Sequence, residues 1–216
     1  MMANCSCDKC PVTQASRPER PHLIRRVPFA VWVFLAVATF TLIHDVMDAR
    51  AEVYHSRVSA LQLAFPAADS VTTTTLMFSE ADAEEVAERA GAALESRLVR
   101  VYEAWCDGQV THRGIIDTHK VRSLPETVMV VTDTDHRVEG VHLLAFHEPV
   151  QYRASDKWFL QFDDRRLDPE LAVRRGIVGM AGATMTSNAV AAAVRRSLAA
   201  LEVGFGDPDP GVGIGK

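Results

Sequence analysis

This chain has few aromatic residues, and its basic residues do not outnumber its acidic ones. Phe, Trp and Tyr make up 7% of its 216 residues, so the core must be mainly aliphatic. Lys and Arg number 23 against 28 Asp and Glu, which gives a net charge of −5 and no reason to expect nucleic acid as a partner. The sequence contains no P-loop, nucleophile triad or paired-acid pattern that supports a catalytic assignment, so we assign no catalytic residue.

Metal-ligand patterns are also weak. Of the four cysteines, Cys5, Cys7 and Cys10 are clustered and Cys106 stands alone. A standard zinc or iron–sulfur site needs four ligands and no fourth cysteine is near, so we favour a disordered, reduced tail; a metal site and acylation near a membrane are the alternatives. Cys106 is expected to be a buried structural thiol. No metal site is assigned, because the central histidines lack metal-ligand spacing; they are His112, His119, His136, His142 and His147.

One long segment has no charge at all. Residues 27–43 read VPFAVWVFLAVATFTLI, and residues 44–47 extend this run toward a membrane interface. At about 1.5 Å per helical residue the extended segment suits a hydrocarbon core of ~30 Å. We therefore expect an uncleaved transmembrane anchor over residues 27–47. A cleaved signal peptide and a buried core helix are the alternatives, but the run exceeds a usual signal-peptide core and lacks a clean cleavage site before Asp45.

The charges beside this segment predict its orientation. The flank before it is mostly basic, with Lys9, Arg17, Arg20, Arg25 and Arg26 against Asp8 and Glu19. The positive-inside rule then places the N-terminus in the cytoplasm and the main domain on the far side of the membrane.

Composition divides the chain into five segments. We expect a disordered cytoplasmic tail (1–26), the anchor (27–47), a juxtamembrane helical and extended region (48–94), the main domain (95–204) and a flexible Gly/Pro-rich tail (205–216). Residues 45 to about 60 are expected to continue the helix from the membrane, and Pro66 is expected to end it. Ser79 and Asp82 suggest a capped helix that stops at Gly91.

The centre of the chain has the period of strands. Leu98–Trp105 alternates in polarity, Asp107-Gly108 is a hairpin turn signal, and residues 109–118 return as the partner strand. A second pair is expected over 127–132 and 137–146. After an irregular stretch, a helix is expected from about Ser187 to Glu202, ended by Gly204. We therefore predict an α+β fold, with an antiparallel sheet of about four strands packed with helices and preceded by one N-terminal transmembrane helix.

Small and hydroxyl-bearing residues precede the last helix. The run is Ala181-Gly182-Ala183-Thr184-Met185-Thr186-Ser187. Gly182 and Ala183 allow close approach of a ligand to the backbone, and Thr184, Thr186 and Ser187 supply hydroxyl groups. The free N–H groups at a helix N-terminus attract anions, so the run suits a phosphate. An ordinary N-capped helix would show the same residues, and the residues alone leave both interpretations open.

This run resembles the flavin attachment motif of the FMN-binding domain family, which includes components of the Rnf electron-transfer complex and of the sodium-pumping NADH:quinone oxidoreductase. The resemblance covers about residues 95–204. It includes a strand that leads to Glu148 and a following stretch, Trp158-Phe-Leu-Gln-Phe162. In that family a threonine in a Ser/Thr-Gly-Ala-Thr context is esterified to the phosphate of flavin mononucleotide (FMN).

The resemblance implies a cofactor site and a cellular role. FMN would be esterified to Thr184, with Gly182, Ala183, Thr186 and Ser187 around its phosphate and with Glu148 and Trp158 near the flavin. Glu148 would bond the ring or anchor the loop. The chain would be a single-pass protein of the bacterial inner membrane with a periplasmic FMN-binding domain. Its partners would be the membrane, a flavin transferase, and redox proteins or a multi-subunit complex.

Two positions depart from the family pattern. Ala181 stands where the family prefers Ser or Thr, and Val178 stands where it favours aspartate. Both belong to the pattern that a flavin transferase reads, so they bear on the covalent bond more than on FMN binding. A membrane-anchored interaction or sensory domain without covalent flavin is therefore the alternative function. An FMN-dependent reductase with its own substrate ranks lower, because no acid–base constellation accompanies the motif.

Overall fold

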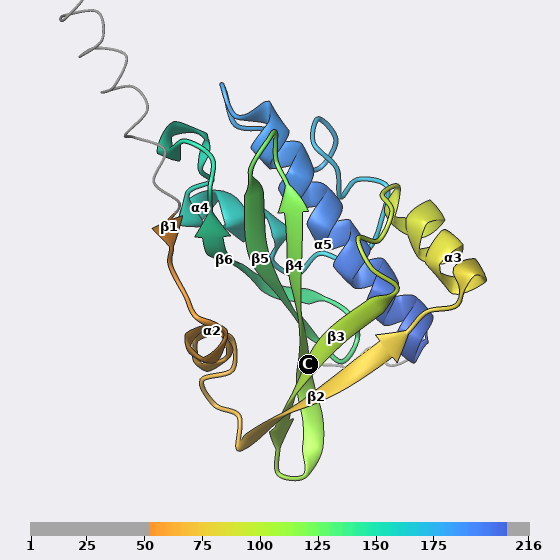
Figure 1. Cartoon of the computed structure of the whole chain (residues 1–216). Coiled ribbons are helices and arrows are strands. Elements are labelled where there is room, and N and C mark those ends of the chain that lie inside the picture. Colours follow the sequence, from red (N-terminus) through yellow and green to blue (C-terminus); the bar gives the residue numbers. More distant parts are fainter. Residues whose placement is uncertain (1–51, 207–216) are drawn as a thin grey trace, which may run out of the picture. The chain divides into compact units, whose positions relative to one another are not determined.

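The computed structural model describes residues 52–206, and the labels below follow Figure 1. The strands in this part of the chain are β1 (Glu52–Val53), β2 (Ser70–Met77), β3 (Leu98–Cys106), β4 (Gln109–Lys120), β5 (Pro125–Asp133) and β6 (Val138–Phe146). The α-helices are α2 (Arg57–Ala64), α3 (Glu80–Ala90), α4 (Asp156–Phe159) and α5 (Thr184–Phe205), and two short 3₁₀ helices are η1 (Val150–Tyr152) and η2 (Leu160–Phe162).

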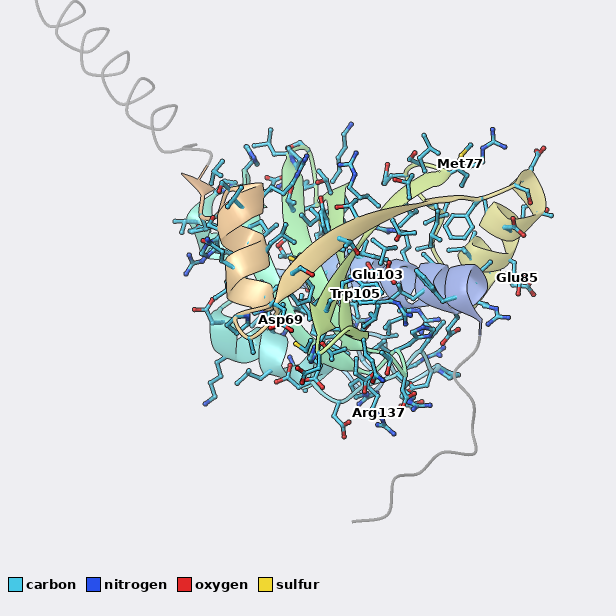
Figure 2. All side chains as sticks on the ribbon, turned by 90° about the horizontal axis from the view of Figure 1, so that it is seen from below. Asp69, Met77, Glu85, Glu103, Trp105 and Arg137 are labelled. Carbon is cyan, nitrogen blue, oxygen red and sulfur yellow. The ribbon has the colours of Figure 1, made fainter. Side chains whose placement is uncertain are left out.

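The strands form one antiparallel sheet in the order β1-β6-β5-β4-β3-β2. The predicted α+β class with an antiparallel sheet is confirmed. The sheet has six strands rather than about four, because β2 pairs with β3 at one edge and β1 pairs with β6 at the other. Edge β2 is also held by side chains of β3: Trp105 donates to Thr72 over 2.8 Å, and Glu103 accepts from Thr74 over 2.6 Å. Glu103 and Trp105 are labelled in Figure 2.

Turn chemistry explains the first hairpin. Asp107 and Gly108, between β3 and β4, both have positive φ, at 51° and 76°. A two-residue turn with positive φ at both positions matches the right-handed twist of the flanking strands. The hairpin predicted from Asp107-Gly108 is therefore confirmed.

The core lies on both faces of the sheet, because successive strand residues point to opposite sides. Val128 and Val130 of β5 pack in one cluster with Val190 and Val194 of α5. The alternate residues of β5, Met129 and Val131, pack in another cluster with Ala60 and Phe65 at α2. Figure 1 shows α5 running along one face of the sheet, with α2 on the other side.

Helix α3 is built as its sequence predicts. The Ser79 hydroxyl accepts from the Asp82 N–H over 3.2 Å, and the Asp82 carboxylate accepts from the Ser79 N–H over 3.0 Å. This reciprocal capping box satisfies donors that the helix itself cannot pair. Gly91, with φ of 67°, ends the helix in the left-handed conformation. Val86 and Ala90 then pack α3 onto the C-terminal half of α5.

The first segment of the described chain corrects one sequence prediction. Instead of a helix continuing to about residue 60, the chain forms β1 at Glu52–Val53, and α2 begins only at Arg57. The cause is local, since the Ser56 hydroxyl caps α2 by accepting from the Ser59 N–H over 3.2 Å. The helix ends at Ala64, before Pro66, as expected. Residues 52–94 thus supply β1, β2 and α3 to the same fold as the residues that follow.

Several sequence expectations concern residues beyond this range. The tail 1–26 with Cys5, Cys7 and Cys10, the anchor 27–47 and residues 207–216 lie outside the described residues. Among residues 52–206, no helix has the length and apolar character needed to cross a bilayer. Cys106 is a free thiol of intermediate exposure, and its Sγ lies 3.3 Å from the Ala67 carbonyl oxygen.

Candidate functional site

Helix α5 begins three residues earlier than its sequence suggests. Thr184 is its first residue and Ala183 its N-cap, and no side chain makes a cap hydrogen bond. Ser187, the expected start, is fully buried one turn inside the helix. Its hydroxyl accepts from the Met180 N–H over 2.9 Å and donates to the Ala183 carbonyl over 3.1 Å. Ser187 therefore fastens the preceding loop to the helix instead of capping it.

This arrangement leaves the start of α5 open to an anion. The first N–H groups of a helix have no intrahelical partner, and the helix dipole adds partial positive charge there. Gly182 has φ of 78°, and the space beside its Cα is empty, so the backbone can approach a ligand closely. Thr184 is exposed, so its hydroxyl can be reached from outside.

A cleft of about 260 Å³ lies at this helix start. It is formed by the β4–β5 turn, the chain around η1 and the first residues of α5, and its lining residues are Val121, Arg122, Glu148, Tyr152, Gly182, Ala183, Thr184, Met185 and Thr186. In Figure 1 the β4–β5 turn lies beside the start of α5. The fold thus brings Glu148 and most of the motif together, although they are far apart in sequence.

Thr186 carries an unusual polar group in this cleft. Its side chain is only 1% exposed, yet its Oγ1 has no hydrogen-bond partner in the structure. Buried hydroxyl groups are nearly always paired, because leaving one unpaired costs about 1–3 kcal/mol. A buried, unpaired hydroxyl in the wall of a cleft is suited to a ligand that brings its own hydrogen-bonding atom.

Glu148 anchors the turn that forms the opposite wall. Its Oε1 accepts from the backbone N–H groups of Arg122 (3.3 Å), Ser123 (2.7 Å) and Leu124 (2.8 Å). Burial of the carboxyl raises the pKa of Glu148, but these donors outweigh burial and hold the pKa below its usual range. Of the two roles that the resemblance allowed for Glu148, the structure shows the loop anchor.

Arg122 is a cleft residue that sequence reasoning missed. Its side chain is exposed, and no ion pair or hydrogen bond of its guanidinium group is found within residues 52–206. A free cation beside a helix N-terminus adds to the attraction for an anion. Val121, Tyr152 and Met185 also line the cleft unpredicted. No local pattern marks these residues, because it is the Glu148 contacts that bring the β4–β5 turn to the cleft.

Trp158 contacts the loop that leads into α5 and is not among the residues that line the cleft. Its indole N–H donates to the Val178 carbonyl over 2.7 Å, and its ring stacks edge-on against Phe162, with centroids 5.4 Å apart. Gln161 accepts from the Val178 N–H over 2.8 Å. These contacts hold the backbone of the loop that leads into α5. The Val178 side chain is 72% exposed and Ala181 is also exposed, so both unusual positions face outward.

The sequence comparison agrees with this geometry. The family model described as FMN-binding domain matches residues 123–199. The matched stretch begins in the β4–β5 turn, ends within α5, and contains Glu148, Trp158 and the whole run from Ala181 to Ser187. Comparison with curated proteins finds no match.

Proposed function

We propose that this chain, which belongs to the FMN-binding domain family through residues 123–199, holds FMN at the start of α5 and passes electrons between a membrane component and a redox partner. The observation that carries the proposal is the match of this family model to the segment that builds the cleft. The unpaired Thr186 hydroxyl and the uncapped helix start are the structural features that fit a phosphate.

The cleft residues suit the phosphate of FMN, but the cleft is too small to enclose the whole molecule. The helix N–H groups and the Thr186 hydroxyl would hold the phosphate, and Arg122 would contribute positive charge. A cleft of about 260 Å³ is smaller than the roughly 300–1,000 Å³ of pockets that enclose a whole small ligand, so part of the flavin would stay at the surface. An exposed flavin edge suits electron exchange with another protein. The redox chemistry is that of the flavin, and the protein supplies binding and electrostatics.

Covalent attachment through Thr184 is the finer part of the proposal. Thr184 is exposed at the cleft mouth, so a transferase could reach it. In the reaction the Thr184 Oγ would form a bond to the phosphorus of an activated flavin phosphate, the bond between that phosphorus and its leaving-group oxygen would break, and the proton from the Thr184 hydroxyl would pass to the leaving group. The phosphodiester keeps one negative charge, which the start of α5 would stabilise by about 0.3–1 kcal/mol at an exposed site.

Membrane anchoring completes the proposed function. The uncharged run 27–43 and its basic flank support a single-pass protein of the bacterial inner membrane, with a cytoplasmic N-terminus and the FMN domain outside the cytoplasm. The tether would keep the flavin close to a membrane donor or to a multi-subunit complex.

The alternative is a membrane-anchored domain that binds no covalent flavin and serves interaction or sensing. Val178 and Ala181 favour it, since they replace the polar residues of the attachment pattern. Their exposed side chains lie where a transferase would read them.

Co-expression with a flavin transferase separates the two functions. We expect a fluorescent band that survives denaturation and a mass increase of one FMN less one water on the peptide containing Thr184. Thr184→Ala should lose both signals, while Thr134→Ala, at an exposed turn threonine outside the cleft, should keep them. A chain that stays unlabelled beside a labelled positive-control substrate would contradict covalent attachment. Failure of that unlabelled chain to bind added FMN would contradict the function itself.

A further inference from the structure

Four ionisable side chains meet between the sheet and α5. His119 of β4 lies between two carboxylates, with Nδ1 2.8 Å from Asp117 Oδ1 and Nε2 3.2 Å from Glu126 Oε2. Arg196 of α5 donates to both oxygens of Asp117, over 2.8 and 3.2 Å. Glu126 is 0% exposed, His119 5% and Arg196 6%. We call these four residues the buried charge network.

His119 is the centre of the network, and its carboxylate neighbours favour its protonated form. Burial lowers the pKa of His119, but its hydrogen bonds to Asp117 and Glu126 outweigh burial and raise that pKa to about 8. Burial raises the pKa of Glu126, against the opposing effect of His119. Glu126 Oε1 has no hydrogen-bond partner in the structure. Since two coupled groups share the charge, His119 and Glu126 titrate as a pair.

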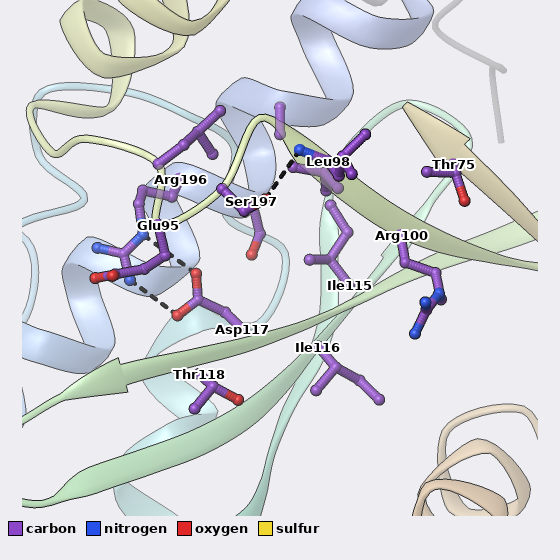
Figure 3. Close-up of a pocket in the computed structure, with 14 residues that line it drawn as sticks. Thr75, Glu95, Leu98, Arg100, Ile115, Ile116, Asp117, Thr118, Arg196 and Ser197 are labelled. Atoms are coloured by element: carbon purple, nitrogen blue, oxygen red, sulfur yellow. Dashed lines mark hydrogen bonds and ion pairs between the residues drawn. The ribbon is translucent and has the colours of Figure 1, made fainter. Parts of the chain in front are cut away.

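The network borders a second cavity and lies close in sequence to residues that line the cleft. His119 and Glu126 are register partners on β4 and β5, and the turn that joins these strands supplies Val121 and Arg122 to the cleft. His119 is thus two residues from the cleft lining, a distance of about 6–7 Å along a strand. At the other end, Asp117 and Arg196 line an open cavity of about 320 Å³, where Figure 3 shows them joined.

A purely structural role explains the Arg196–Asp117 pair, but it does not explain why His119 and Glu126 are buried beside it. The Arg196–Asp117 pair ties α5 to β4. His119 and Glu126 add a buried carboxylate with an unpaired oxygen, which is less favourable than an apolar pair of similar size. Among residues 52–206, no group of three or more His, Cys, Asp and Glu that could hold a metal ion is found.

We propose that the buried charge network takes up a proton from solvent when the flavin in the neighbouring cleft is reduced, and releases it on reoxidation. This rests on the proposed function. The electrons come from an external reductant and add negative charge at the cleft. The proton comes from water in the second cavity and forms an N–H bond on His119 or an O–H bond on Glu126. His119 and Glu126 are thus positioning residues that set the charge beside the flavin.

Other charges around His119 do not replace this role. Asp117, Glu126 and Arg196 are the charged groups that face it from β4, β5 and α5. Lys120 and Arg122, on the same strand and its turn, have exposed side chains. Glu148 is already held as a carboxylate by backbone donors.

The midpoint potential of the FMN-loaded protein, measured against pH with dithionite as reductant, tests the proposal. The wild-type curve should change slope at about pH 8, where the network begins to exchange its proton. His119→Gln should remove that change of slope. His142→Gln, at a half-buried histidine of β6 outside the network, should retain it. Identical curves for the wild type and a folded His119→Gln variant would overturn the proposal.

A second measurement needs no variant. The pKa of the His119 imidazole, followed by NMR, should rise when bound FMN is reduced, because added negative charge stabilises the imidazolium. By linkage, this shift must equal the effect of His119 protonation on the potential. An unchanged His119 pKa would overturn the proposal while leaving FMN binding intact. A protein that retains no FMN would instead overturn the proposed function, and this proposal with it.

Discussion

Helices α3 and α5 both begin beside serine and threonine residues, but they use these residues differently. At α3 the Ser79 hydroxyl and the Asp82 carboxylate pair with backbone N–H groups of the first turn. At α5 no side chain caps the helix, Ser187 is turned inward, and the Thr186 hydroxyl is unpaired. When side chains accept hydrogen bonds from the first N–H groups of a helix, few free donors remain for a ligand. The start of α5 keeps its donors free, and this difference is why we propose the FMN site there and not at α3.

The largest effect on stability is expected from Glu148→Gln. The neutral amide is a weaker acceptor for the three N–H groups of the β4–β5 turn, so unfolding free energy should fall by about 2 kcal/mol. FMN affinity should fall with it, because the turn forms one wall of the cleft. Glu139→Gln, at an exposed residue of β6, is the matched control. Equal denaturation midpoints for both variants would show that Glu148 does not anchor the turn.

The same pair of variants carries a pH prediction. The pKa of Glu148 is lower in the folded protein than in the unfolded chain, so its contribution to stability is complete above the unfolded value of about 4.5. That contribution is lost as pH falls through the folded pKa. The stability difference between wild type and Glu148→Gln should therefore shrink below about pH 4.5 in urea titrations at several pH values. A difference that stays constant down to the acid limit would contradict this assignment.

Thr186→Val tests the unpaired hydroxyl. In protein made without a transferase, the Kd for FMN should rise about tenfold, the equivalent of one hydrogen bond to a charged group. The ligand-free protein should be no less stable, since the variant removes a polar atom that has no partner. Thr186→Ser keeps a hydroxyl and should keep most of the affinity. An unchanged Kd in isothermal titration of the valine variant would place the phosphate elsewhere.

The corresponding change at α3 should affect stability alone. Ser79→Ala removes one side of the capping box and should lower the unfolding free energy by about 1 kcal/mol. FMN affinity should not change, because α3 contributes nothing to the cleft. Chemical denaturation and FMN titration of one preparation give both values. A loss of affinity here would mean that the two helix starts are not independent.

The smallest expected effect comes from a negative charge introduced at Met185, which should raise stability and lower FMN affinity. Met185 is 52% exposed in the first turn of α5. Met185→Glu should stabilise the ligand-free helix by about 0.3–1 kcal/mol through the helix dipole and should weaken FMN binding several-fold by repelling the phosphate. Met185→Gln has the same length without the charge and should do neither. Stability and affinity that move in the same direction would contradict an anion site at this end.

Local chemistry allowed α3, the Asp107-Gly108 hairpin and the sheet class to be predicted from sequence, since each depends on neighbouring residues. The start of α5 was misplaced because Ser187 looks like a cap. Its hydroxyl contacts Met180 and Ala183 only once the preceding loop is folded. Gly204 does not end the helix: α5 continues to Phe205, and Gly206, with φ of 93°, follows it, while the Leu76 side chain packs beside the Gly204 Cα.

The candidate site was predictable where one motif holds the residues. Gly182, Ala183, Thr184 and Thr186 line the cleft together, and Glu148 joins them from a distant segment. Trp158 does not line the cleft, and its indole N–H donates to the Val178 carbonyl; its predicted place near the flavin stays a prediction. Arg122 and the network around His119 depend on contacts between β4, β5 and α5. Such contacts leave no pattern in a single sequence.

The most direct measurement of the central claim is an NMR titration of the isotopically labelled protein with FMN, following every assigned backbone amide. FMN held at the open helix start should give the largest shifts at Thr184, Met185 and Thr186, with smaller ones at Arg122 across the cleft. The capped start of α3, at Glu80–Asp82, should not respond. Saturable shifts centred on any other part of the domain, or none at all, would contradict the account.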